Sequence, residues 1–458
     1  MSAAEEQGNQ GRTPGEGVAP DRTATGAAPG RESETTDRRT VLRTMAAAGL
    51  AAAAPALLTR NARAAGRTIK IGFVSPETGP IAAFGEADDF VLAGVRKAIG
   101  KGLMINGTEY PVTIIKKDSQ SNPNRAAQVT SELINSDKVD LVLGSSTSDT
   151  TIPVADQCEL NGVPCITTDT PWQAWFFGRK GDPKKGFEWT SHFFWGVEAI
   201  TAVFTNLWLS IDSNKTVGAL WSNDPDGIAL SDAQHGFPAA IKQRGLKYVD
   251  LGLYPTMSDD FSSQINALKE AKADIVTGVF VPPAFATFWT QCAQQSFHPK
   301  MATPAKALLF PSAVQALGDR GAGLSTEVWW SPHHPFKSGL TGESAQQFCD
   351  AYTRATGRQW TQPIGFKHAV LEVALDVLKR TRKIDDPAAI RDAIAETNYN
   401  SIVGPVNFKT GPVKSVATTP LVGGQWKRGK KTKYELEIVD NQTAPFIPVD
   451  SKFTPIAY

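Results

Sequence analysis

The sequence has little of what metal centres, redox sites and disulfide frameworks require. Its 458 residues include only four cysteines and six histidines. Cys158, Cys165, Cys292 and Cys349 form no C-x-x-C pair of the kind that binds a metal ion. We therefore expect four buried free thiols, with a disulfide between Cys158 and Cys165 as the alternative because these two are close in sequence. No metal and no cofactor is expected.

The chain also lacks an excess of either charge and the common catalytic motifs. It has 47 basic and 46 acidic residues, a net charge of +1, which gives no electrostatic reason to expect a nucleic-acid partner. There is no G-x-G-x-x-G after the first strand, no P-loop, no H-E-x-x-H and no G-x-S-x-G. The one histidine pair, His333-His334, would point to opposite faces of a strand. No catalytic residue is assigned.

Only the N-terminal region contains a long apolar run. Residues 1–37 show no apolar periodicity and are predicted to be a disordered extension. In residues 38–65, paired arginines at 38 and 39 precede the run Met45–Leu58 and a small-residue end at Ala62–Ala65. These three parts are typical of a secretory signal, and the arginine pair is typical of twin-arginine export. An uncleaved amphipathic anchor is the alternative. We expect an exported protein, in the periplasm or at the outer face of the cytoplasmic membrane.

Strand-like and helix-like segments alternate from residue 68 onward. The run Ile69–Val74 is typical of a strand, and the apolar residues spaced along 91–99 form one face of a helix. The alternation predicts a parallel sheet with helices on both faces. It pauses near His192–Gly196 and then restarts, with a last strand expected at Ala307–Phe310.

Two successive units of this kind predict an α/β fold with two doubly wound parallel-sheet lobes. We expect three crossings between them, near Gly196, Ser331 and Gly404. The first lobe would comprise residues 67–195 plus 331–404, and the second lobe residues 196–330 plus 405–458.

Ligands of open α/β sheets bind outside the carboxyl ends of the strands, so the loops there are informative. The loop Gly144–Thr151 is rich in hydroxyl groups and leads into a predicted helix. Capping accounts for one or two of these hydroxyls, and a bound anionic group at the helix N-terminus would account for more. The segment Thr168–Phe177 contains four aromatic residues. Core packing explains some of them, and Trp172 is a candidate for the wall of a ligand cleft.

The motifs in combination resemble those of the type I periplasmic solute-binding proteins of the branched-chain amino acid type. The resemblance covers nearly all of residues 67–440. It rests on Ile69-Lys70-Ile71-Gly72, Thr78-Gly79-Pro80, Val142-Leu143-Gly144-Ser145, Asp260-Phe261-Ser262 and Gly404-Pro405-Val406.

The resemblance implies a set of ligand-binding positions in both lobes. Phe84 would line the mouth of the cleft, and the hydroxyl of Ser148 would bind a ligand carboxylate. The other implied positions are Ser146 and Thr147 beside Ser148, Asp169 and Thr170 at the ligand head group, and Asp226 and Phe280 in the second lobe.

The chain departs from the family at one informative position. Amino-acid binders of the family place an acid in the loop that matches Phe310–Ser312, where it pairs with the ligand ammonium; here that position is Ser312. Because a buried ammonium group without a partner is costly, either Asp169 replaces the acid or the ligand has no ammonium group. The expected solute is therefore branched-chain amino acid-like, an aromatic acid or an amide.

The resemblance implies a binding protein without enzymatic activity that serves an ABC importer. It would capture the solute by hinge closure and deliver it to the permease subunits. During export its partners would be the twin-arginine machinery and signal peptidase. A twin-arginine-exported enzyme and the ligand-sensing lobe of a receptor are the alternatives, and the lack of a later membrane-spanning or kinase-like segment disfavours the receptor.

Overall fold

The computed structural model describes residues 66–458. The predicted extension and export signal, residues 1–65, lie outside the described residues. Among the described helices, none combines the length and hydrophobicity that a membrane crossing requires.

A six-stranded parallel sheet forms the first lobe, in the order β15-β7-β6-β5-β1-β4. Alternate side chains of β1 enter two cores, since Ile71 and Phe73 pack toward α1 and α12 whereas Val74 packs toward α2 and α3. The elements are β1 (Ile69–Ser75), β4 (Val112–Asp118), β5 (Leu141–Ser145), β6 (Cys165–Thr168), β7 (Thr190–Phe193), β15 (Val416–Ala417), α1 (Asp88–Ile99), α2 (Pro123–Glu132), α3 (Ser148–Asn161) and α12 (Pro363–Arg380).

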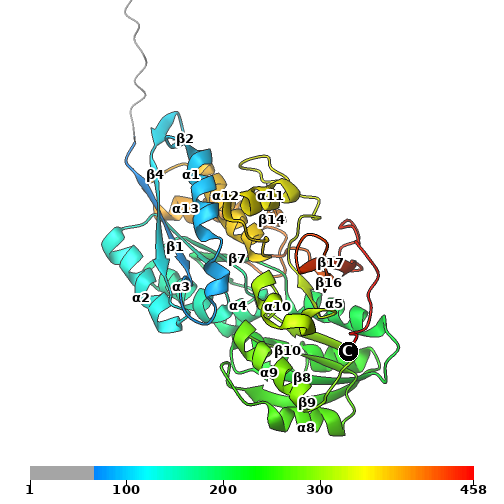
Figure 1. Ribbon diagram of the computed structural model, residues 1–458. Coiled ribbons are helices and arrows are strands. Elements are labelled where there is room, and N and C mark those ends of the chain that lie inside the picture. The colour runs from blue at the N-terminus through cyan, green and yellow to red at the C-terminus, as the bar shows by residue number, and fades with distance from the viewer. Residues whose placement is uncertain (1–65) are drawn as a thin grey trace, which may run out of the picture. The chain divides into compact units, whose positions relative to one another are not determined.

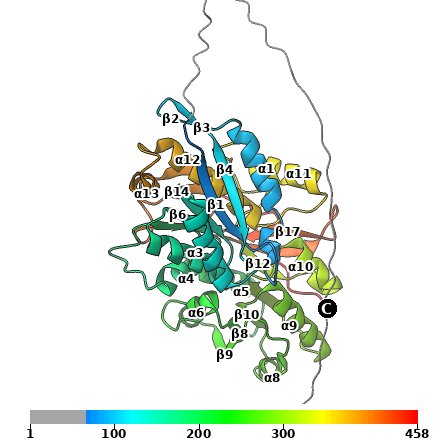
Figure 2. The same cartoon turned by 90° about the vertical axis from the view of Figure 1, so that its left-hand side faces the viewer.

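A four-stranded parallel sheet, in the order β11-β10-β8-β9, forms the second lobe. Its strands lie below those of the first lobe in both views (Figures 1 and 2). The predicted two-lobed α/β fold is therefore confirmed. The elements are β8 (Thr216–Ser222), β9 (Lys247–Tyr254), β10 (Ile275–Val279), β11 (Met301–Ala305), α5 (Val197–Leu209), α6 (Pro225–Leu230), α7 (Phe237–Gln243), α8 (Ser262–Glu270) and α9 (Pro282–Gln294).

A third sheet has three antiparallel strands in the order β12-β16-β17. Its strands are β12 (Ser325–Val328), β16 (Val422–Arg428) and β17 (Tyr434–Asp440). Strand β12 comes just before the second crossing, and β16 comes just after the third. The remaining elements are the hairpin β2 (Leu103–Ile105) and β3 (Thr108–Tyr110), the hairpin β13 (Asn398–Ser401) and β14 (Gly404–Asn407), and the helices α4 (Trp172–Gly178), α10 (Pro311–Ala316), α11 (Ala345–Thr356) and α13 (Pro387–Ala395).

The third crossing lies further along the chain than the predicted boundary at residue 404. Gly404 begins β14, which pairs with β13, and the later strand β15 still pairs with β7 of the first-lobe sheet. The chain therefore leaves the first lobe after Ala417. A strand of two residues carries too little periodicity to be recognised from the sequence.

The last strand of the second lobe was also misplaced by the sequence reasoning. The strand is β11, whose residues Met301–Ala305 pair with Ile275–Val279, and the predicted strand Ala307–Phe310 is a buried turn that leads into α10. Pro304 obscured the true strand, and it is tolerated because β11 is at the sheet edge.

The four cysteines are free and buried, as the sequence predicted. Burial raises the pKa of the Cys158, Cys292 and Cys349 thiols. They therefore act as small apolar core residues.

Candidate functional site

The loop after β5 carries three buried hydroxyl groups that contact no hydrogen-bond partner. Ser146, Thr147 and Ser148 are at most 2% exposed, and none of their hydroxyl oxygens has a partner among the described residues. Thr147 is the N-cap of α3, yet its side chain makes no capping hydrogen bond. Helix capping therefore does not account for these three hydroxyl groups, which we call the hydroxyl row. Leaving each of them buried and unpaired costs about 1–3 kcal/mol.

Asp169 follows β6 and lies beside this loop. Its backbone has a φ of 70°, and its Oδ2 accepts a hydrogen bond of 2.6 Å from the Ser145 hydroxyl. Its Oδ1 is buried without a partner. Burial raises the pKa of Asp169 to about 7, although the nearby Lys367 ammonium lowers it. The carboxyl group is therefore able to accept one more hydrogen bond.

Thr170 and Lys367 hold these loops in place. The Thr170 hydroxyl donates to the Ser146 carbonyl at 3.2 Å, and the Thr170 carbonyl lies 2.7 Å from Nε2 of His192. The Lys367 ammonium, from α12, donates to the Ser75 hydroxyl at 2.7 Å and to the Ser145 carbonyl at 2.5 Å. Thr170 is thus a positioning residue whose own hydroxyl is already paired.

The second lobe presents a buried group of charges to the first turn of α3. Lys306, the residue after β11, places its ammonium 3.0 Å from Asp224 and 3.0 Å from Asp226. Burial raises the pKa of Asp149 in α3 to about 6, with Lys306 lowering it and the two second-lobe carboxylates raising it further. Charged groups of both lobes therefore interact directly.

Asp226 is the member of this group that lies against the hydroxyl row. Burial raises the pKa of its carboxyl, while Lys306 and the Ser148 hydroxyl lower it. The approach of Ser148 falls short of a well-formed hydrogen bond, and Oδ1 of Asp226 remains buried without a partner. Lys306 itself was not singled out from the sequence, because the predicted strand Ala307–Phe310 placed it before the start of a strand and not after the end of one.

Four aromatic residues from the two lobes and the crossings form a series of ring contacts. Phe84 is 1% exposed, and its ring centroid lies 5.0 Å from that of Phe310 and 6.2 Å from that of Trp329. Trp195, just after β7, lies 6.0 Å from Trp329, just after β12. Both indole N–H groups are buried and have no acceptor among the described residues. The sequence reasoning missed both tryptophans, whose only signal was their position at the crossings.

Several residues near the carboxyl edges of the strands each have a buried polar atom without a partner, and seven of them belong to the hydroxyl-rich loop, the acids beside it or the crossings. We refer to them as the inter-lobe site. They are Ser146, Thr147, Ser148, Asp169, Trp195, Asp226 and Trp329.

The structure gives three predicted site residues other surroundings. Trp172 begins α4, and its indole N–H donates to Glu198 at the start of α5 at 3.0 Å, so it fastens the first crossing. Phe280 packs inside the second lobe against the rings of Phe261 and Phe288. Ser312 is exposed on α10, because the residue that follows β11 is Lys306.

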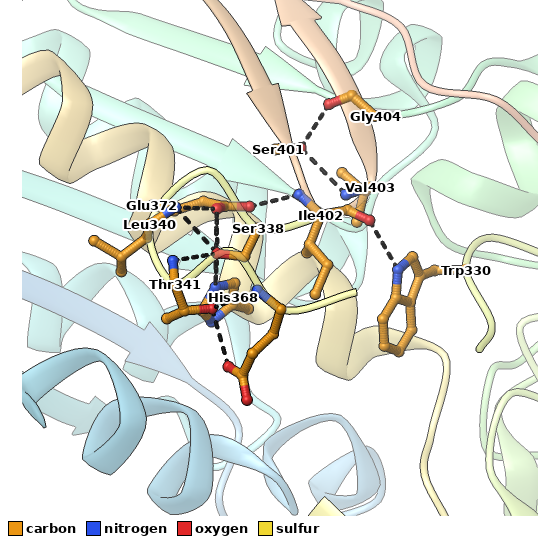
Figure 3. A network of polar contacts seen from close by, with 11 residues as sticks. Trp330, Ser338, Leu340, Thr341, His368, Glu372, Ser401, Ile402, Val403 and Gly404 are labelled. Carbon is orange, nitrogen blue, oxygen red and sulfur yellow. Dashed lines mark hydrogen bonds and ion pairs between the residues drawn. The ribbon is translucent and has the colours of Figure 1, made fainter. Parts of the chain in front are cut away.

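A buried Ser–His–Glu group bears on the alternative of an enzyme (Figure 3). The Ser338 hydroxyl lies 2.8 Å from Nε2 of His368 and 2.8 Å from Oε2 of Glu372, while Oε1 of Glu372 accepts from the Ile402 N–H at 2.6 Å. In a catalytic triad the acid would orient the histidine, whereas Nδ1 of His368 has no partner. All three side chains are buried. The group is therefore a structural tie between α12, the Ser338 loop and the β13–β14 hairpin.

No side-chain cluster in residues 66–458 is suited to a metal ion, since no three His, Cys, Asp or Glu residues there are placed to hold one. The two acids of the inter-lobe site lie near lysines: Asp226 forms an ion pair with Lys306, and the charge of Lys367 lowers the pKa of Asp169.

Comparison with known proteins identifies the family of the chain. The sequence model of the family described as "Periplasmic binding protein" matches residues 68–431. A Leu/Ile/Val-binding protein homolog of Brucella melitensis is 24% identical over 378 residues, which cover 77% of this chain and 91% of the relative.

Solved structures share the fold. A leucine-binding protein from Thermotoga maritima has a TM-score of 0.68 at 21% identity, covering 82% of this chain and 99% of its own. A solute-binding protein from R. palustris in complex with 4-hydroxybenzoate has a TM-score of 0.67 at 17% identity, covering 81% of this chain and 96% of its own.

Proposed function

This chain belongs to the periplasmic binding protein family, and from that premise we propose that it captures a small carboxylate- or amide-bearing solute for an ABC importer. The relatives are binding proteins and not enzymes, which agrees with the expectation of no catalytic activity. The observation that carries the proposal is the row of three buried hydroxyls, Ser146, Thr147 and Ser148, without partners.

A carboxylate suits this row for two reasons. Its oxygens accept hydrogen bonds from hydroxyl groups, and hydrogen bonds to a charged group are worth about 1.5–3 kcal/mol each. The row also lies at the N-terminus of α3, a helix of 14 residues, whose dipole and free N–H groups favour an anion. An amide oxygen would use the same donors more weakly.

Closure of the two lobes would complete the site. Ser148 and Asp149 belong to the first lobe, whereas Asp226 and Lys306 belong to the second, so their interactions exist only when the lobes are together. A solute that contacts both sides binds the closed form more tightly and shifts the population toward it. Delivery to a permease is part of the same proposal and is supported by family membership. Export through the twin-arginine route is proposed from the arginine pair at residues 38 and 39.

The names of the similar proteins suit the same chemistry. One structural neighbour is a leucine-binding protein and another holds 4-hydroxybenzoate, and both of these compounds carry a carboxylate. We therefore place a carboxylate on the hydroxyl row and treat the remainder of the solute as the variable part.

A thermal-shift screen of the exported chain tests the proposal. The panel comprises amino acids, hydroxybenzoates and small amides, with the matching amines that lack a carboxylate or amide as controls. A true ligand at a hundred times its Kd stabilises the fold by about 2.7 kcal/mol. Stabilisation by a carboxylate or amide, with the compound recovered unchanged, supports the proposal. A panel without any stabilising member, or turnover of the compound, contradicts it.

A further inference from the structure

We propose that the solute carries, besides its carboxylate or amide, a second hydrogen-bond acceptor that pairs with the indole N–H groups of Trp195 and Trp329. This inference rests on the proposed function and specifies the part of the solute that lies at the crossings. A purely aliphatic end, such as the side chain of leucine, would then be a poor fit.

The first support is the contrast between these two tryptophans and the others. Most buried indole N–H groups in residues 66–458 donate to a protein acceptor. These are Trp172 to Glu198, Trp208 to Thr303, Trp221 to Tyr248, Trp289 to Arg320, Trp330 to Ile402 and Trp426 to Leu308.

Trp195 and Trp329 break this pattern at one place in the fold. Each is 3% exposed, and neither indole N–H has an acceptor. Their ring centroids lie 6.0 Å apart with the planes at 56°. Trp175 also lacks an acceptor, but among the described residues no second unpaired indole lies beside it; its ring stacks on His192. Two neighbouring donors without acceptors indicate that a group outside the chain pairs with them.

The second support is a chain of contacts that leads from the hydroxyl row to the tryptophans. The Thr170 hydroxyl donates to the Ser146 carbonyl, and the backbone N–H of Trp172 donates to the backbone carbonyl of Trp195 at 3.1 Å. The short segment from Thr170 to Trp172 therefore connects both. In this proposal, the far end of a solute whose carboxylate binds at the hydroxyl row reaches the two tryptophans.

The third support is the surroundings of Trp329. Its ring contacts Phe84 at 6.2 Å and Phe194 at 4.8 Å, and its backbone N–H donates to Gln362 at 2.7 Å. Ring contacts alone do not require an indole, because phenylalanine at 195 and 329 would suit a flat or apolar solute equally well. The indole N–H groups add a demand for an acceptor, since a buried unpaired donor costs about 1–3 kcal/mol. A hydroxyl, an amide carbonyl or a second carboxylate on the solute meets that demand.

Calorimetric titration with matched compounds tests the inference. The probes are benzoate against 3-hydroxybenzoate and 4-hydroxybenzoate, and phenylalanine against tyrosine, since each pair differs by one oxygen. In the natural sequence, the best oxygen-bearing probe should bind about tenfold more tightly than its matched partner, as expected for one recovered hydrogen bond. In the variant carrying both Trp195→Phe and Trp329→Phe, this preference should fall to about twofold or less.

Trp172→Phe is the matched control. Its indole N–H is already paired with Glu198, so the variant should keep the preference for the oxygen-bearing probe. The single variants Trp195→Phe and Trp329→Phe provide the same test if the double variant does not fold, and each should reduce the preference.

The outcomes are separable. Equal affinity for matched probes in the natural sequence would overturn the inference and indicate that water alone pairs with the indoles, while leaving the proposed function standing. A preference that persists in the tryptophan variants would also overturn it. If no carboxylate or amide binds at all, the proposed function fails and the inference fails with it.

Discussion

The hydroxyl of Ser148 in the first lobe lies against the carboxyl group of Asp226 in the second lobe. Ser148 Oγ and Asp226 Oδ1 are both buried, and neither has a hydrogen-bond partner of good geometry among the described residues. Two polar groups brought together from different lobes and left incompletely paired suggest that a third group completes the contact. The predictions below follow from this relationship and from the charges around it.

Replacing Ser148 with alanine should weaken binding of a carboxylate solute. The lost hydrogen bond to a charged group is worth about 1.5–3 kcal/mol, which corresponds to roughly tenfold or more in Kd. Calorimetric titration measures the change. Thr150→Val is the control, because the Thr150 hydroxyl already contacts the Thr147 carbonyl and its loss should lower stability with little change in Kd. An unchanged Kd for Ser148→Ala would show that the ligand carboxylate does not bind at the hydroxyl row.

Replacing Lys306 with methionine should strongly destabilise the second lobe. The change leaves Asp224 and Asp226 buried without their shared cation, and breaking a buried pair in this way costs about 3–5 kcal/mol. Urea unfolding measures the loss. Adding Asp224→Asn and Asp226→Asn to the same variant should restore part of the stability. If Lys306→Met is as stable as the natural sequence, the three charges do not interact as described.

Replacing Glu372 with glutamine should remove one source of pH-dependent stability. Burial raises the pKa of Glu372 to about 7 from 4.5, so the folded chain holds a proton there that the unfolded chain releases. The resulting stabilisation is complete below pH 4.5 and is lost as pH rises through about 7. Glu372→Gln mimics the protonated acid and should match the natural sequence at pH 4 and exceed it at pH 8.

The size of that difference is about 3 kcal/mol, from the 4.5-to-7 shift. Urea unfolding at several pH values measures it. Burial lowers the pKa of His368 to about 4, which adds an opposite slope below pH 6.5, so the difference between the two proteins is best measured above that pH. Asp376→Asn, at a carboxylate of the same helix paired with Arg380, is the control and should show no such divergence. Parallel stability curves for Glu372→Gln and the natural sequence would show that Glu372 is ionised throughout.

The four cysteines should not react with a thiol reagent while the chain is folded. All are buried, and burial disfavours the thiolate that is the reactive form. A colorimetric thiol assay should find no reactive thiol under native conditions and four after denaturation without reductant. Only two reactive thiols after denaturation would reveal a disulfide between Cys158 and Cys165.

The sequence allowed the fold and the hydroxyl row to be predicted because both follow from local patterns. Alternating strands and helices predict the parallel sheets, and the rule that ligands bind at the carboxyl ends of strands draws attention to the hydroxyl-rich loop that contains Ser146–Ser148. Asp169 and Asp226 came instead from the resemblance to the family.

The residues that were missed depend on long-range pairing. Trp329 follows β12, whose partner strand β16 lies about a hundred residues further on, with Ser325 opposite Gln425. Lys306 was missed because Pro304 disguises β11, and a strand placed a few residues too late moves its carboxyl end from Lys306 to Ser312. Trp195 lies in a segment that reads as a break, although β7 ends just before it. No local pattern reports which strand a distant segment will join.

Small-angle X-ray scattering of the protein with and without a saturating carboxylate or amide solute tests the central claim most directly. The account predicts a smaller radius of gyration with the solute, because contacts such as Ser148 with Asp226 form only when the lobes close. Superimposable curves, recorded under conditions where calorimetry shows the site to be full, would contradict it.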